Sequence, residues 1–293
     1  MDKVFLDITK KCNGKCRYCY TNSGQAKNNE LTTSEIKRLI DELAKCGIKS
    51  LSIAGGEPLI RSDIIEILYY TKGKIKCSLT SNGTIMNPEL ISAFIDTNTK
   101  ITISIDTLDN IHSSLIRTGI NLNLVVSNIK LLTQYEELRN IMSLRTTVST
   151  ININELLQIV YFCEEYKIPK LKINSLNPYG RAKKQKNLVP DFAQFMEKLL
   201  YINNYCLSNK MCTKVELPIE KYLSKQKHKC QLGKSSLSIN EQGKCFPCAF
   251  SEGNLVLGNI RQMSVEEIIN SCKHFNHDNE ICNACIINRY EKK

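Results

Sequence analysis

The chain has 293 residues, of which 42% are apolar and 24% are charged, and its formal net charge is +11. This apolar share can form a sizeable core, so a disordered chain is excluded and one large domain plus a small one is expected. No run approaches the roughly 20 apolar residues of a membrane-spanning helix, and the first residues lack a signal peptide, so we expect a cytoplasmic protein without a membrane partner. Lysines are spread along the whole chain, which favours a solvated basic surface over a nucleic-acid partner.

Short β-rich runs alternate with longer helical patterns up to about residue 200, which indicates parallel strand–helix units. The six predicted strands are 4–8, 50–53, 75–80, 100–105, 143–148 and 170–174. The predicted helices are 34–46 (with Thr33 as N-cap), 63–71, 88–95, 122–132, 153–166 and 190–203. A closed eight-stranded barrel takes about 250 residues, so six units in about 200 predict an α/β fold, a partial (β/α)6 TIM-like barrel with one open side.

The composition changes after about residue 205, where the regular alternation stops. Eight of the fourteen cysteines lie beyond this point. In a chain this long and without an export signal, cysteines indicate metal binding rather than disulfides. The apolar content of this part is thin, so a metal centre is expected to supply part of its stability. We therefore expect two domains, the partial barrel at 1–205 and a small α+β metal-cluster domain at 206–293.

Three cysteines follow the first predicted strand directly. Cys12, Cys16 and Cys19 form a Cys-x3-Cys-x2-Cys run at the carboxyl end of that strand, where barrel enzymes place their chemistry. Structural zinc sites and simple electron-transfer [4Fe-4S] sites take four protein ligands, so three thiolates suggest a cluster with one iron open to another molecule. A zinc knuckle or buried structural thiols are the alternative interpretations.

A second motif, the turn Ala-Gly-Gly-Glu-Pro at 54–58, follows the second predicted strand. Glycines let a backbone approach a ligand closely, and a carboxylate can accept hydrogen bonds from an ammonium group. Together, the three-cysteine run and this turn resemble the signature of the radical SAM enzymes. The resemblance implies that the three cysteines hold a [4Fe-4S] cluster completed by S-adenosylmethionine (SAM), whose amino group is held by Gly55, Gly56 and Glu57. In that family the cluster reduces SAM, and the 5′-deoxyadenosyl radical released abstracts hydrogen from the substrate.

The same resemblance implies further SAM contacts. Tyr18 matches an aromatic position beside the adenine, although packing is an alternative role. Ser104 and Asp106 match residues near the ribose and the methionyl part. Arg145 is a candidate for the SAM carboxylate, because a guanidinium matches a carboxylate with two hydrogen bonds, and a surface salt bridge is the alternative. The other implied contacts are Ser81 and Asn82, in what is also an ordinary turn sequence, and Asn174 and Arg181 near a Gly-Arg-Ala turn.

The C-terminal cysteines form a second set. Cys230 and Cys248 are followed by a Cys-x2-Cys pair, Cys282 and Cys285. This arrangement resembles the SPASM domain in its shortened, twitch form, which implies that these four cysteines bind one auxiliary [4Fe-4S] cluster. Zinc is the main rival, because four thiolates also satisfy a tetrahedral Zn(II). Cys245 is expected to be free or beside the ligands, with replacement of one ligand as the alternative.

The resemblance covers essentially the whole chain and implies a radical SAM oxidoreductase or maturase with two [4Fe-4S] clusters. The auxiliary cluster would receive or relay an electron, and the expected partner is an external donor such as flavodoxin or ferredoxin. The first expected substrate is a ribosomally made peptide that gains a thioether, a carbon–carbon crosslink or an epimerised centre. Dehydrogenation or epimerisation of a sugar or aminocyclitol is the alternative, and a zinc or iron–sulfur scaffold is the non-enzyme alternative. The sequence identifies no catalytic residue and no hydrogen-donor cysteine.

Overall fold

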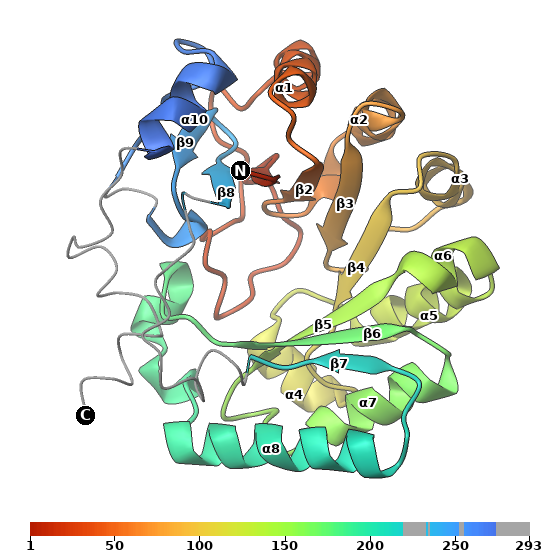
Figure 1. Cartoon of the computed structure of the whole chain (residues 1–293). Helices are drawn as coiled ribbons and strands as arrows, with labels where there is room; N and C mark the ends of the chain where they lie inside the picture. Colours follow the sequence, from red (N-terminus) through yellow and green to blue (C-terminus); the bar gives the residue numbers. More distant parts are fainter. Residues whose placement is uncertain (219–232, 234, 252–254, 274–293) are drawn as a thin grey trace.

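The structure is a computed structural model that describes residues 1–218, 233, 235–251 and 255–273. Its centre is a curved ten-stranded sheet in the order β10-β9-β8-β1-β2-β3-β4-β5-β6-β7, with helices along its outer side (Figure 1). The strands from β1 to β7 pair in parallel with their neighbours in chain order. This is the α/β partial barrel that the alternating pattern predicts.

The parallel strands are short and follow the predicted positions closely. Their bounds are β1 (Lys3–Asp7), β2 (Ser50–Ala54), β3 (Lys76–Ser81), β4 (Lys100–Ser104), β5 (Ser143–Val148), β6 (Lys170–Ser175) and β7 (Lys214–Glu216). In β1, Val4 and Leu6 are fully buried, whereas Lys3, Phe5 and Asp7 on the other face are only partly buried. The apolar face therefore packs against the helices and the more polar face lines the inside of the barrel.

The helices that cover the outer face alternate with these strands. Their bounds are α1 (Thr33–Lys45), α2 (Ile64–Thr71), α3 (Pro88–Asp96), α4 (Asn110–Ile116), α5 (Leu122–Thr133), α6 (Glu136–Ile141), α7 (Leu156–Glu165) and α8 (Phe192–Ser208), with 3-10 turns η1 (Pro58–Ile60), η2 (Gly180–Lys184) and η3 (Lys186–Leu188). No helix in the described part of the chain is both long and apolar enough to cross a membrane.

Several predicted details are wrong. The N-cap of α1 is Thr32 rather than Thr33, because the Thr32 side chain accepts from Glu35 N while Glu35 binds back to the Thr32 N–H. The short helices α4 and α6 and the strand β7 were not predicted, since segments of three to seven residues carry little periodicity. Apart from these corrections, the domain boundary at 205/206 stays a prediction, and α8 continues past it to Ser208.

The C-terminal part adds to the same sheet. It contributes β8 (Ser236–Ile239), β9 (Lys244–Phe246), β10 (Gly258–Asn259) and α10 (Val265–Lys273). Strand β8 pairs in parallel with β1, while β9 and β10 continue the sheet in antiparallel pairs. The small C-terminal domain is therefore hydrogen-bonded to the first barrel strand, and Figure 1 shows α10 and β8 beside the N-terminal strands.

Polar contacts fix α10 and the turn before it against α1. Arg261 Nε lies 2.5 Å from Glu35 Oε1, and Arg38 Nη2 donates to the Ile260 carbonyl at 3.1 Å. At the start of α10, the Val265 N–H donates to Glu42 Oε2 at 3.0 Å. The C-terminal domain therefore packs against α1, the first helix of the barrel, through α10 and the turn before it.

Candidate active site

The segment from Cys12 to Cys19, which we call the cysteine loop, leaves β1 at the carboxyl end of the parallel strands. Its three thiols are half-buried. Burial raises the pKa of the Cys12 thiol, and the nearby Cys16 and Cys19 raise it further, which shows that the three sulfurs are neighbours. A ligand that needs thiolates must therefore displace protons from this loop.

Three thiols on one loop can serve two kinds of metal group. A tetrahedral zinc ion, with bonds of about 2.3 Å to sulfur, gathers its ligands around a single metal and normally takes four of them. The thiolates of an iron–sulfur cubane bind different irons. The three thiols of the cysteine loop are therefore candidate ligands for a [4Fe-4S] cluster, with a zinc knuckle as the alternative.

The Gly-Gly-Glu turn after β2 packs directly on the start of the cysteine loop. Gly56 N donates to the Thr9 carbonyl at 2.7 Å, and Glu57 N donates to the Lys11 carbonyl at 2.8 Å. A Cβ added at Gly56 would lie only 2.1 Å from the Lys11 carbonyl oxygen. The sequence suggested close approach to a ligand, whereas the close approach seen here is between two backbones. Any larger residue at 56 would push the two motifs apart.

Glu57 is fully buried and holds the next strand end in place. Its carboxylate accepts from Ser81 Oγ at 2.9 Å, from Asn82 N at 2.6 Å and from Leu59 N at 3.1 Å. Burial nevertheless raises the pKa of Glu57 to about 6. Asn82 also donates from Nδ2 to Asn13 Oδ1 at 2.7 Å, within the cysteine loop. Ser81 and Asn82 thus bind the Gly-Gly-Glu turn, and Asn82 also links it to the cysteine loop.

The Gly-Arg-Ala turn at η2 contacts the other end of the cysteine loop. Arg181 N donates to the Cys19 carbonyl at 3.0 Å, its Nε to the Cys16 carbonyl at 2.8 Å, and its Nη1 to the Ser23 carbonyl at 2.7 Å. Gly180 has a φ of +55°, and a Cβ there would lie 2.3 Å from the Cys19 carbonyl oxygen. Arg181 therefore stabilises the backbone of the loop through hydrogen bonds to its carbonyl groups.

Asp106, at the end of β4, is buried under the cysteine loop with 1% exposure. Its Oδ1 accepts from Thr147 N at 2.8 Å, and its Oδ2 accepts from the Tyr18 hydroxyl. Burial raises the pKa of Asp106. Tyr18 packs its ring beside the small apolar group Leu176, Ala182 and Leu188. The structure thus joins two sequence-predicted SAM contacts to each other.

The other predicted contacts are dispersed along β4, β5 and β6. Arg145 is largely buried inside the barrel, where burial lowers its pKa, and its Nε has no hydrogen-bond partner among the described residues. Burial and the nearby Arg145 also lower the pKa of Lys172 to about 8. Ser104 is half-buried, and Asn174 is exposed. The unpartnered Arg145 Nε fits a role toward an anionic group better than a surface salt bridge.

The sequence did not predict the turn that follows α4. Lys15 N donates to the Thr118 carbonyl at 2.7 Å, and Arg17 N donates to the Ile116 carbonyl at 2.9 Å. Between these carbonyls, the side chain of Arg117 is 3% exposed and reaches under the loop. The only signal in the sequence is an arginine in an Ile-Arg-Thr-Gly stretch, which is too common a pattern to single out.

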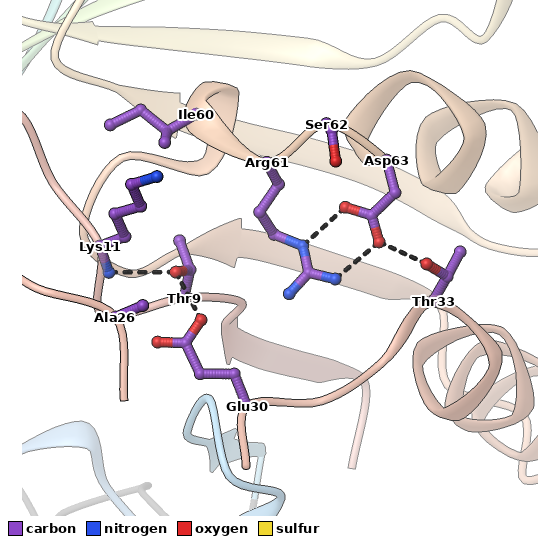
Figure 2. A pocket seen from close by; sticks show the side chains of 9 residues that line it. All are labelled: Thr9, Lys11, Ala26, Glu30, Thr33, Ile60, Arg61, Ser62 and Asp63. Atoms are coloured by element: carbon purple, nitrogen blue, oxygen red, sulfur yellow. Dashed lines mark hydrogen bonds and ion pairs between the residues drawn. The ribbon is translucent and has the colours of Figure 1, made fainter. Parts of the chain in front are cut away.

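Beside the start of the cysteine loop is a pocket of about 320 Å³ (Figure 2). Its polar side chains bind one another: Arg61 Nε and Nη2 donate to Asp63 at 2.8 and 2.6 Å, and Thr9 Oγ1 donates to Glu30 Oε2 at 2.7 Å. Thr33 Oγ1 completes the set by donating to Asp63 at 2.6 Å. These contacts tie β1, η1 and α1 together, so we assign the pocket no ligand.

In the second set of cysteines, Cys245 and Cys248 differ in their burial. Cys245 is fully buried in the core, and burial raises the pKa of its thiol to about 12. Cys248 is half-buried, and its sulfur accepts from Phe250 N at 3.3 Å. This difference supports Cys248 as the ligand and Cys245 as a core residue. The predicted ligands Cys230, Cys282 and Cys285 lie outside the described residues.

Comparison with known families decides what this arrangement is. The profile of the Radical SAM superfamily matches residues 6–163, more than half of the chain. The chain belongs to the radical SAM superfamily. A second profile, that of the SPASM iron-sulfur cluster-binding domain, matches residues 230–286. The protein is therefore a radical SAM enzyme with a C-terminal SPASM domain, as the sequence motifs predict.

Individual relatives of this radical SAM enzyme have different activities. It is 35% identical over 131 residues to a probable GTP 3′,8-cyclase of Methanococcus maripaludis, a match that covers 43% of each chain, so it matches less than half of the cyclase. It is 25% identical over 315 residues to an AdoMet-dependent heme synthase of Methanosarcina barkeri, covering 99% of this chain and 88% of the synthase. The fold matches Streptococcus suis SuiB bound to the precursor peptide SuiA with a TM-score of 0.77 at 17% identity, over 98% of this chain and 70% of SuiB.

Proposed function

We propose that this radical SAM enzyme modifies a ribosomally made peptide, forming a thioether, a carbon–carbon crosslink or an epimerised centre. In this proposal Cys12, Cys16 and Cys19 hold the SAM-binding [4Fe-4S] cluster. When bound, the cluster and SAM supply a 5′-deoxyadenosyl radical that abstracts hydrogen from the substrate. The observation that carries the proposal is the cysteine loop itself, with three half-buried thiols on a backbone held from several sides.

The surrounding residues give that loop a fixed shape. Gly56 and Glu57 donate to carbonyl groups in the segment just before the loop, and Arg181 donates to the carbonyls of Cys16 and Cys19 within it. Such preorganisation keeps the sulfurs in one arrangement, so cluster binding costs little reordering. Glu57, Tyr18 and Arg145 remain our candidates for SAM contacts, together with Gly55, Gly56, Ser81, Asn82, Ser104, Asp106, Asn174 and Arg181.

The second cluster belongs to the same proposal. Cys230, Cys248, Cys282 and Cys285 would bind one auxiliary [4Fe-4S] cluster, which takes or relays the electron left after the radical step. In this proposal the barrel domain precedes these four cysteines, and the auxiliary domain begins after Ser208, the last residue of α8. The reaction is placed in the cytoplasm, where reducing conditions protect clusters and a flavodoxin or ferredoxin can donate electrons.

A peptide substrate is supported by the fold shared with SuiB over almost the whole chain. A small-molecule substrate is the second candidate, because the heme synthase of Methanosarcina barkeri matches 99% of the chain. An iron porphyrin would then replace the peptide, and a sugar or aminocyclitol is a further small-molecule option. The bond chemistry of the first step is the same for all of them.

Cluster content tests the assignment of the ligands. Anaerobic reconstitution of the full chain should give about eight irons, since each cubane holds about four. The triple variant Cys12→Ala/Cys16→Ala/Cys19→Ala should lose half of the iron and all release of 5′-deoxyadenosine from SAM under dithionite. The pair Cys282→Ala/Cys285→Ala should also lose half of the iron. The matched control Cys46→Ala, at an exposed cysteine outside both sets, should lose none.

Substrate class needs a separate measurement. The loaded enzyme is incubated with SAM, dithionite and the peptide encoded by a short reading frame beside the gene, and the peptide is analysed by mass spectrometry. Loss of two hydrogen atoms, or uptake of solvent deuterium at one α-carbon, supports peptide modification. If 5′-deoxyadenosine forms but only an iron porphyrin or an aminocyclitol is converted, the peptide proposal is wrong and the cluster assignment stands.

A further inference from the structure

The guanidinium of Arg117 lies under the cysteine loop, in a place that no sequence motif marks. It is 3% exposed, and its charge is close enough to Cys16 to oppose the rise that burial causes in the pKa of that thiol. Its Nη1 donates to the Ser104 carbonyl, and its Nη2 donates to the Asn82 carbonyl at 3.3 Å. Because the guanidinium is buried, water screens its positive charge only weakly. The charge therefore acts on the nearby Cys16 sulfur and on a cluster bound to that sulfur.

The backbone holds this charge at a fixed distance from the loop. Lys15 and Arg17, on either side of Cys16, donate their N–H groups to carbonyls on either side of Arg117. The position of Arg117 relative to Cys16 is thus set by two main-chain hydrogen bonds as well as by its own side chain. A side chain held this way works as a permanent charge beside the sulfur.

Asp106 provides the opposing charge. Its Oδ2 lies 3.8 Å from Arg117 Nε, too far for a hydrogen bond, and Nε has no other partner among the described residues. Asp106 binds Thr147 N and the Tyr18 hydroxyl instead. The buried cation and the buried anion therefore lie side by side under the cysteine loop, with no hydrogen bond between Arg117 Nε and Asp106.

This geometry has an electrostatic consequence for a cluster bound to the loop. Reduction adds one negative charge to a group that already carries three thiolates. A buried cation near a ligand sulfur stabilises the reduced form, and a buried anion destabilises it. Because the site has a low dielectric constant, both effects are larger than they would be at the surface.

We propose that Arg117 and Asp106 together set the reduction potential of the cluster on the cysteine loop. Arg117 raises the potential and Asp106 lowers it. Arg117 is a positioning residue beside Cys16, and Asp106 has this electrostatic role in addition to its place among the candidate SAM contacts. The inference rests on the proposed function only in its assignment of the first cluster to Cys12, Cys16 and Cys19.

Redox titration of the reconstituted full chain, followed by electron paramagnetic resonance, tests the proposal. The first cluster is the one whose reduced signal changes on addition of SAM. Arg117→Gln should shift its midpoint potential to more negative values, and Asp106→Asn should shift it to more positive values. The double variant Arg117→Gln/Asp106→Asn should return towards the wild-type potential. The signal that does not respond to SAM should stay unchanged in all three variants.

Opposite signs separate this role from a merely structural one. Shifts of the same sign, or no shift in either single variant, would overturn the proposal. If Arg117→Gln loses iron, the variant Arg117→Lys is measured in its place. A wild-type potential in Arg117→Lys together with a positive shift in Asp106→Asn supports the charge effect. An unshifted potential in Asp106→Asn overturns it. A wild-type chain that binds no cluster through the cysteine loop would instead contradict the proposed function.

Discussion

Glu57 is a buried carboxylate whose charge state is linked to stability. It accepts three hydrogen bonds, yet burial holds its pKa at about 6, above the ordinary 4.5. Between these two values the folded chain binds more protons than the unfolded chain. The protonated form therefore stabilises the fold below pH 4.5, and this contribution is lost as the pH rises through 6.

We expect Glu57→Gln to remove this pH dependence. The free energy of unfolding of the SAM-free wild type, minus that of the variant, should fall by up to about 2 kcal/mol between pH 4.5 and 7, the equivalent of the pKa shift. Urea unfolding at several pH values measures it. Glu66→Gln, at a carboxylate exposed by 58% on α2, is the control for replacing a carboxylate that is not buried. A flat difference for Glu57→Gln would mean that its carboxylate titrates normally.

At the scale of the element, the start of α1 depends on a capping box. Glu35 N donates to Thr32 Oγ1 at 3.3 Å, and Thr32 N donates to Glu35 Oε2 at 2.9 Å. Thr32→Ala should lower the free energy of unfolding by about 1 kcal/mol, because one N–H at the helix start loses its acceptor. Thr32→Ser keeps the hydroxyl acceptor and should change the free energy of unfolding by less than about 0.5 kcal/mol, because serine caps a helix at least as well as threonine. Equal losses in the two variants, measured by urea unfolding, would show that the hydroxyl does not cap the helix.

The same helix shows what sequence patterns can and cannot give. The spacing of Ile36, Leu39, Ile40 and Leu43 predicts α1 to within one residue, and all four are buried. It does not select Thr32 over Thr33, because both are good caps and the choice depends on where Glu35 folds back. Thr33 instead donates to Asp63, a contact between separate elements that no local pattern contains.

In the candidate site, too, local patterns can be predicted from the sequence, whereas contacts between distant segments cannot. The spacing of Cys12, Cys16 and Cys19 is local, so the sequence alone predicts the cysteine loop as a site. The partners of that loop come from distant segments, as with Arg181 on the Cys16 carbonyl and the turn around Arg117 on the main chain beside Cys16. These contacts depend on how the strand ends converge, which only the folded chain shows. Sequence patterns therefore predict candidate ligands more readily than the residues that position them.

At the scale of the whole molecule, the two cluster-binding regions are joined by aromatic rings. Tyr20 follows the last cysteine of the cysteine loop, and Phe250 lies two residues after Cys248. Their ring centroids are 5.7 Å apart in an edge-on arrangement, and the ring of Tyr179 lies 5.2 Å from Phe250 on another side. Together with the pairing of β8 and β1, this contact makes the relative position of the two regions part of the folded structure.

A double-mutant cycle measures that link. Tyr20→Leu and Phe250→Leu should show a coupling energy of about 0.5 to 1.5 kcal/mol in urea unfolding, the range of aromatic pairs. The cycle cancels the separate loss of the Tyr20 hydroxyl bond to Asp7. The control cycle pairs Phe250→Leu with Tyr161→Leu, whose ring contacts Tyr205 instead, and should be additive to within about 0.5 kcal/mol. If the first cycle is as additive as the control, the rings contribute nothing to joining the two regions, and β-pairing and the α1–α10 contacts alone hold them together.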